Sequence, residues 1–203
     1  IDPNIIIDRF GLDQFKYFIL REVPLGNDGD FSINALISRV NSDLSNNLGN
    51  LIQRVIKFLN KNYDNLVPVS IESYLDDSDQ LKRGYQLINI IKNKIENFQL
   101  SKCLEEIFLY IDHLNKFMDE SEPWNTFKTD PKIAAKDLSI LIECFRIVGI
   151  ILQPFIPNAA KNILDMLNID PSNRNFKHLT HDFSIKEKHK LNLPQPLFPR
   201  YEK

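Results

Sequence analysis

Three side chains in this sequence of 203 residues have the types and spacing needed to bind an unstacked nucleobase. Asn50 and Arg54 are four positions apart, so in a helix they project from the same face. An amide both donates to and accepts from a base edge, and a guanidinium offers a planar fork of donors. Trp124, the only tryptophan, follows Pro123 and offers a flat ring for stacking. This combination suits the recognition of single-stranded RNA.

Basic residues near these positions could bind phosphates. They lie on the long helix predicted below and just after the tryptophan: Arg39, Lys57, Lys61, Lys128 and Lys132. The formal net charge is -2, so an RNA-binding surface would be a local patch and not the whole protein. Each feature has a simpler interpretation, because Asn50 and Arg54 also fit a solvated helix edge, Trp124 a core position and the lysines ordinary surface. The residues alone therefore predict a helical protein suited to RNA and go no further.

The sequence offers no catalytic constellation and no metal site. Residues 26–30 carry acidic side chains where a phosphate loop needs amides and a lysine, and they lack the closing Glu of a calcium loop. One histidine, His113, falls within the fourth predicted helix and the other three lie in the tail, and they are not expected to form a metal site. Cys103 and Cys144 lie in apolar helical patterns without zinc-ligand spacing, which predicts buried thiols in a cytoplasmic protein. No apolar run has the length of a membrane span, so no membrane partner is expected.

Helices must position the candidate residues. Glycine is scarce, with six residues, and apolar side chains recur at steps of three and four. Helices are predicted over 12–22, 32–62, 76–97, from a cap at Ser101, from Asp130-Pro131 to Pro154, and over 158–167. The helix over 32–62 carries a continuous apolar stripe: Leu36, Val40, Leu44, Leu48, Leu51, Val55 and Leu59.

The predicted fold class is all-α, an antiparallel helix bundle with an N-terminal linker and an extended C-terminal tail. We expect a linker over 1–31 that includes a polar loop over 24–30, a bundle over 32–168, and a return segment over 169–203. Prolines at positions 194, 196 and 199 favour the extended conformation at the end. The chain begins Ile1-Asp2-Pro3 without a methionine or a signal-peptide pattern, so we expect it to be the inner part of a longer protein.

Several motifs, in order, resemble one family. They are Arg9-Phe10-Gly11-Leu12-Asp13, the stretch 17–32, Asn41-Ser42-Asp43-Leu44-Ser45-Asn46-Asn47-Leu48-Gly49-Asn50-Leu51, Glu122-Pro123-Trp124, and Pro196-Leu197-Phe198-Pro199-Arg200. Together they resemble bacterial-type methionyl-tRNA synthetases, from the junction that follows the catalytic domain to the end of the core enzyme. The resemblance covers nearly the whole chain and is densest over residues 1–55.

The resemblance implies a class I synthetase anticodon-binding domain and assigns roles to individual residues. Asn50 and Arg54 match the pair that recognises bases of the CAU anticodon, chiefly its cytosine. Trp124 matches the ring that stacks on an unstacked anticodon base, and Pro123 shapes the same pocket. Residues 1–31 match the segment that packs under the active site and contacts the inner face of the tRNA.

The same resemblance defines what is expected outside this chain. The whole enzyme would use ATP to attach methionine to tRNA(Met), with its HIGH and KMSKS signatures, its methionine pocket and any zinc knuckle before Ile1. The chain alone is therefore expected to be inactive, to hold no cofactor, and to bind the anticodon loop beside the missing catalytic domain. Two alternatives stay open: a non-catalytic helical module for protein or RNA interaction, and the anticodon-binding domain of another class I synthetase. Gln53 could also compete with Arg54 for the recognition role.

Overall fold

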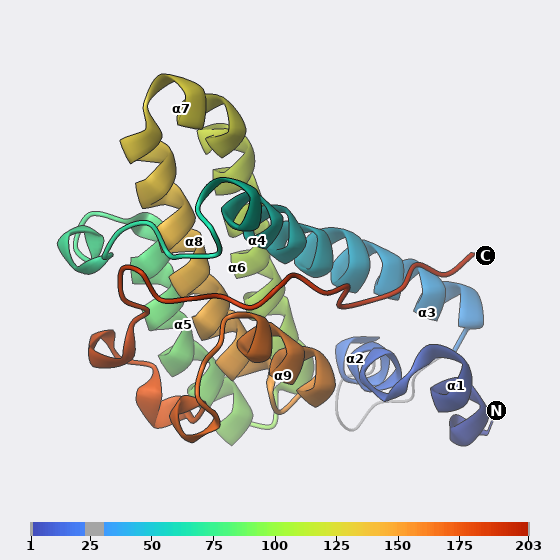
Figure 1. The fold of residues 1–203 in the computed structure, drawn as a ribbon. Coiled ribbons are helices and arrows are strands. Elements are labelled where there is room, and N and C mark those ends of the chain that lie inside the picture. The colour runs from blue at the N-terminus through green and yellow to red at the C-terminus, as the bar shows by residue number, and fades with distance from the viewer. Residues whose placement is uncertain (1, 23–30, 203) are drawn as a thin grey trace.

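The regular structure of the chain is helical (Figure 1). The computed structural model describes residues 2–22 and 31–202. Within those ranges the only strand-like pairing is an isolated antiparallel bridge between Leu66 and Lys190. The all-α prediction is confirmed. The polar loop predicted over 24–30, with its glycines and acidic residues, lies outside the described residues.

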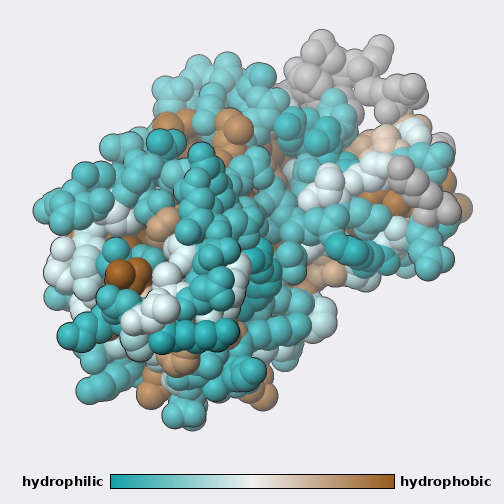
Figure 2. Space-filling view, turned by 90° about the horizontal axis from the view of Figure 1, so that it is seen from above, coloured by the Kyte–Doolittle hydropathy of each residue, from teal (hydrophilic) through white to brown (hydrophobic). Residues whose placement is uncertain are grey.

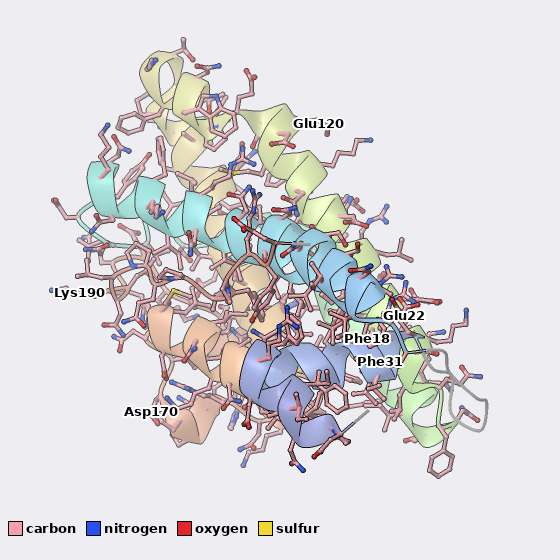
Figure 3. All side chains as sticks on the ribbon, turned by 90° about the vertical axis from the view of Figure 1, so that its right-hand side faces the viewer. Phe18, Glu22, Phe31, Glu120, Asp170 and Lys190 are labelled. Carbon is pink, nitrogen blue, oxygen red and sulfur yellow. The ribbon has the colours of Figure 1, made fainter. Side chains whose placement is uncertain are left out.

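Two short helices form the N-terminal part. α2 (Leu12–Glu22) has the predicted bounds, whereas α1 (Pro3–Phe10) was not predicted. Gly11 joins them with φ at 95°, a conformation that strains any side-chain-bearing residue, and a Cβ there would lie 2.5 Å from the side-chain oxygen of Gln14. Figure 3 shows Phe18 of α2 beside Phe31, and their rings meet edge to face at 5.5 Å. The aromatic contact fixes α2 against the start of the long helix.

The long helix predicted over 32–62 is present but is not α-helical throughout. α3 (Ile33–Arg39) continues into a π-helix, η1 (Val40–Gly49), and then into α4 (Asn50–Asn62). Ser32 caps its start as predicted, since its hydroxyl accepts from the Ala35 N–H at 3.4 Å. All seven residues of the predicted apolar stripe are buried. The π-helical segment was not predicted; such segments are frequent at functional sites.

The other long helices pack around one central helix. They are α5 (Asp79–Glu96), α6 (Leu100–Ser121), α8 (Pro131–Leu152) and α9 (Pro157–Met166). Every residue of α8 from position 137 to 152 is buried, as expected of a helix covered on all sides. α5, α6 and α9 lie around it (Figure 1), so α8 forms the middle of the core.

The predicted helix ends are partly right. Asp130 caps α8 as predicted, because its carboxylate accepts from the Lys132 N–H at 3.1 Å, and Pro131 occupies the first turn. The cap predicted at Ser101 is wrong: α6 begins after Gln99, and Ser101 lies inside its first turn. Phe98 adopts the left-handed conformation with φ at 56°, and this turns the chain earlier than the sequence suggested.

The C-terminal tail is extended over only part of the predicted range. Three 3-10 turns come first, η3 (Pro171–Asn173), η4 (Phe176–His178) and η5 (His181–Phe183). The turns are stabilised from the core, since the buried Arg146 guanidinium donates to the His178 carbonyl at 2.8 Å. The remaining tail runs back along α4 and η1 (Figure 1). The division at residues 31 and 168 stays a prediction.

The surface seen in Figure 2 is largely hydrophilic, and its hydrophobic residues form small, separate patches. Among the described residues, no helix combines the length and the apolar character needed to cross a membrane.

Candidate nucleic-acid interface

The face of α4 next to α6 carries two of the candidate residues. Asn50 begins α4 and is exposed, and its side-chain amide forms no hydrogen bond with any described residue. Arg54 lies one turn further on, with a third of its side chain exposed, and its Nη2 donates to Oδ1 of Asp119 at 3.0 Å. A guanidinium has five N–H donors. Asp119 therefore orients Arg54 and leaves donors available for a ligand.

Trp124 lies beside Arg54. The guanidinium carbon is 5.1 Å from the centre of the indole ring, a cation–π distance. The ring is partly buried and packs on the edge of the core. Two residues far apart in the sequence are thus brought into direct contact.

A sharp turn places Trp124 there. The sequence suggested that the ring lies where the fourth helix stops. α6 does end at Ser121, but Trp124 belongs to the first turn of another helix, α7 (Pro123–Thr129), which was not predicted. Between the two helices Glu122 adopts the left-handed conformation with φ at 40°, a strained state for a residue other than glycine. Pro123 is buried and has the fixed φ that starts a helix well.

Aromatic contacts hold α7 against α4. The Phe127 ring meets Phe58 at 5.7 Å and Tyr63 at 5.4 Å, both edge to face. The Tyr63 hydroxyl also donates to the Pro131 carbonyl at 3.4 Å. The position of Trp124 relative to Arg54 is therefore fixed by packing within the chain.

Gln53, the potential competitor of Arg54, points toward a different partner. Its amide nitrogen donates to the Gln195 carbonyl of the tail at 3.3 Å, and its oxygen accepts from Lys57 at 3.4 Å. Asp119 is the residue that sequence reasoning missed here. It stands five positions before Trp124, but only the packing of α6 against the long helix brings it to Arg54.

The candidate phosphate-binding residues fall into two groups. Lys57, Lys61, Lys128 and Lys132 are exposed, and within the described part of the chain none forms an ion pair. Lys57 and Lys61 continue the edge of Asn50 and Arg54 at steps of three and four. Arg39 differs, since it is ion-paired with Glu22 and with Asp43. We therefore leave Arg39 out of the candidate interface.

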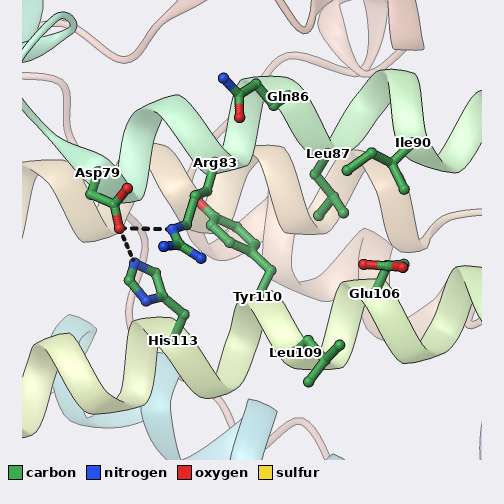
Figure 4. Close-up of a pocket in the computed structure, with 9 residues that line it drawn as sticks. All are labelled: Asp79, Arg83, Gln86, Leu87, Ile90, Glu106, Leu109, Tyr110 and His113. Atoms are coloured by element: carbon green, nitrogen blue, oxygen red, sulfur yellow. Dashed lines mark hydrogen bonds and ion pairs between the residues drawn. The ribbon is translucent and has the colours of Figure 1, made fainter.

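A separate hollow between α5 and α6 is lined by none of the residues predicted to bind RNA (Figure 4). Asp79 accepts from Nε of Arg83 at 2.7 Å and lies 3.3 Å from Nε2 of His113. Burial lowers the pKa of His113, which favours its neutral form. These contacts join two packed helices and include no nucleophile.

The buried thiols are poor nucleophiles as well. Cys103 and Cys144 are free and buried, as predicted, and burial raises the pKa of the Cys144 thiol to about 12. No cluster of three or more potential metal ligands occurs among the described residues. The Arg54–Trp124 contact is therefore the arrangement with the clearest chemistry, suited to binding a planar group with a polar edge.

Comparison with known proteins assigns the chain to a class. Residues 1–56 match the family described as tRNA synthetases class I (M), and residues 73–203 match the anticodon binding domain of methionyl tRNA ligase. The chain belongs to the methionyl-tRNA ligase anticodon-binding domain family. The resemblance inferred from the motifs is confirmed.

Individual relatives agree with this assignment. The methionine–tRNA ligase of Rickettsia felis is 38% identical over 205 aligned positions, which cover 100% of this chain and 40% of the relative. The enzyme of Rhizobium meliloti is 35% identical, and the alignment covers 99% of this chain and 39% of that enzyme. The crystal structure of apo Mycobacterium tuberculosis methionyl-tRNA synthetase superimposes with a TM-score of 0.93 at 32% identity, over 100% of this chain and 41% of that one. The chain thus spans about 40% of the length of the curated relatives it matches.

Proposed function

We propose that this chain binds the CAU anticodon loop of tRNA(Met) through Asn50, Arg54, Pro123 and Trp124. The observation that carries the proposal is the 5.1 Å contact between the Arg54 guanidinium and the Trp124 ring. An unstacked base needs a flat surface and hydrogen-bonding groups at its edge, and this contact joins the two. Pro123, the buried residue that precedes the ring, starts the helix that carries it.

Each polar group would have a distinct role in the complex. Arg54, oriented by Asp119, would donate to the acceptor atoms of the cytosine. The amide of Asn50, which no described residue engages, would donate or accept at a base edge one helical turn away. The exposed Lys57, Lys61 and Lys128 would attract the phosphates, which makes the affinity salt-dependent.

The proposal extends to the longer protein from which this chain would come. That protein would be a cytoplasmic methionine–tRNA ligase that uses ATP to attach methionine to tRNA(Met). Its catalytic domain would hold the ATP and any zinc, and this chain alone would form no methionyl-adenylate. The support is the similarity to relatives named methionine–tRNA ligase, of which this chain covers about 40%.

A binding titration tests the proposal. The chain would be titrated with an RNA stem-loop that carries CAU in its loop, and with a second one in which only the first anticodon base is changed to U. A base-edge contact is worth about 1–3 kcal/mol, so the second RNA should bind about 5- to 150-fold more weakly. Equal affinity for both RNAs would contradict the proposal.

A matched variant controls for the loss of an exposed arginine. Arg83, like Arg54, is paired with an aspartate, but it is more exposed and lies on α5 in the hollow of Figure 4. Arg83→Ala should retain the preference for CAU, whereas Arg54→Ala should lose it. If both variants keep the preference, another residue recognises the cytosine.

A further inference from the structure

Asn50 also lines a groove between the long helix and the tail. Gly49, Asn50 and Gln53 of the long helix form one wall, and the other wall comes from the crossing segment, residues 195–201 of the tail. The groove has a volume of about 330 Å³. The long helix faces α6 on one side, where Arg54 meets Asp119, and the crossing segment on the other, where Gln53 meets Gln195. Asn50 stands at the exposed edge between them.

Hydrogen bonds to the long helix hold the crossing segment in place. The Ser45 hydroxyl donates to the Pro199 carbonyl at 2.9 Å. The Asn41 amide donates to the Tyr201 carbonyl at 2.8 Å and accepts from the Tyr201 N–H at 3.0 Å. The Tyr201 hydroxyl donates to the Phe10 carbonyl of α1 at 2.7 Å. Together with the Gln53–Gln195 contact, these bonds anchor the segment on both sides of Phe198, whose ring is partly exposed in the groove.

Gly49 lets this ring lie close to the helix. A Cβ at position 49 would be 3.5 Å from Cδ2 of Phe198 and 3.1 Å from the Leu44 carbonyl oxygen. A Cβ there would crowd the helix backbone and would lie in van der Waals contact with the ring. The glycine, at the end of the π-helix, leaves Phe198 beside Asn50 as a second flat surface.

The polar groups of the groove suit a base and its phosphate. Asn50 and Gln53 provide amides, and Arg200, which donates to Asn46, provides a cation. Among the described residues that line the groove there is no carboxylate. The hollow between α5 and α6 differs in this respect, because Asp79 and Glu106 line it and would repel a phosphate.

We propose that this groove binds a second unpaired nucleobase of the same RNA loop, stacked on Phe198, with Gln53 or Asn50 at its edge and Arg200 at its phosphate. The proposal rests on the function proposed above. In the proposed complex, one base would stack on Trp124 and be contacted by Arg54. The base of the adjacent nucleotide would stack on Phe198. Four residues of helix separate Asn50 from Arg54 by only about 6 Å along the axis, so the two sites share one edge of the long helix.

The test replaces the ring of Phe198 and compares it with a matched position. Phe198→Leu removes the flat surface and keeps the apolar bulk, and Phe176→Leu makes the same change at another partly buried tail position. Loss of one base–aromatic stack should weaken binding of the CAU stem-loop about 5- to 150-fold for Phe198→Leu and leave Phe176→Leu unchanged. Phe198→Tyr, which keeps a ring, should bind like the unaltered chain.

RNAs with a single abasic nucleotide then identify the contact. An abasic nucleotide next to the one bound at Trp124 should weaken binding to the unaltered chain and abolish the difference between that chain and Phe198→Leu. If Phe198→Leu instead weakens every abasic RNA equally, or lowers the melting temperature while the folded fraction binds normally, the ring only holds the tail and the proposal is wrong. If Trp124→Leu weakens binding and Phe198→Leu does not, the second site is refuted while the proposed function stands.

Discussion

Two arginine–carboxylate pairs in this protein share their chemistry and differ in their surroundings. Arg146 and Glu143 pair inside α8 at 2.6 Å, with 1% and 0% of their side chains exposed. Arg54 and Asp119 pair at 3.0 Å between α4 and α6, with 33% and 63% exposed. The comparison separates the part of the molecule that maintains the fold from the part that is available to a ligand.

The buried pair is fully engaged within the chain. Glu143 also accepts from the Tyr85 hydroxyl at 2.8 Å and from the Ile185 N–H at 2.9 Å. Arg146 also donates to the His178 carbonyl. Because both side chains are buried, loss of either Arg146 or Glu143 would leave the other as an unpaired buried charge. The pair thus fastens the turns of the tail to the central helix.

The exposed pair has the opposite character. Solvent screens both charges, and exposed pairs stabilise proteins by only about 0.2–1 kcal/mol. The remaining donors of Arg54 point to no other described residue, and the Trp124 ring lies beside them. A pair that adds little to stability and keeps free donors is suited to binding.

The largest effect is expected at the buried pair. Arg146→Ala leaves Glu143 buried without its counter-charge and should lower the free energy of unfolding by about 3–5 kcal/mol. Arg54→Ala should lower it by no more than about 1 kcal/mol. Urea denaturation of both variants and of the unaltered chain measures this contrast. Equal destabilisation of the two variants would remove the distinction between the two regions.

The next effect concerns binding at the exposed site. Trp124→Leu keeps apolar bulk at the edge of the core but removes the stacking surface, so affinity for the CAU stem-loop should fall by about 1–3 kcal/mol. Trp124→Phe, with a smaller ring, should lose less. Fluorescence anisotropy with labelled RNA gives both affinities. If Trp124→Leu unfolds the chain while its folded fraction binds RNA normally, the indole serves only to pack the core.

The smallest effect tests the lysines that continue the edge of Arg54. Lys61→Gln removes one proposed phosphate contact, so the slope of log K against log salt should become less steep by about 0.7. Lys161→Gln on α9, an exposed lysine paired with Asp165, serves as the control and should leave the slope unchanged. Titrations at several salt concentrations measure the slopes. Identical slopes for both variants would exclude Lys61 from the RNA interface.

Local signals in the sequence predicted much of the fold. The apolar steps gave the long helix and its buried stripe, and Ser32 and Asp130 marked two helix starts through their own side chains. The π-helix was missed, although the stripe from Leu36 to Leu48 advances only in steps of four. In an α-helix each such step drifts by about 40° around the axis, so a long run of them is a sign of altered winding.

The remaining features depend on contacts between distant residues. Glu122 adopts the left-handed conformation that turns the chain, although no glycine marks this position in the sequence. The sequence therefore did not predict α7. Asp119 meets Arg54, and Gln53 turns to Gln195, only after the elements pack. Residue type and spacing suggested Asn50, Arg54 and Trp124, and the resemblance supplied their roles and that of Pro123. Their roles in RNA binding stay a proposal that the Arg54–Trp124 contact supports.

A double-mutant cycle between Arg54 and the first anticodon base tests the central claim most directly. The chain and its Arg54→Ala variant would each be titrated with the CAU stem-loop and with the one whose first base is changed. If Arg54 contacts the cytosine edge, the two changes should be coupled by about 1–3 kcal/mol, and the variant should bind both RNAs equally. Additive effects, with the variant keeping the full preference for cytosine, would contradict the account.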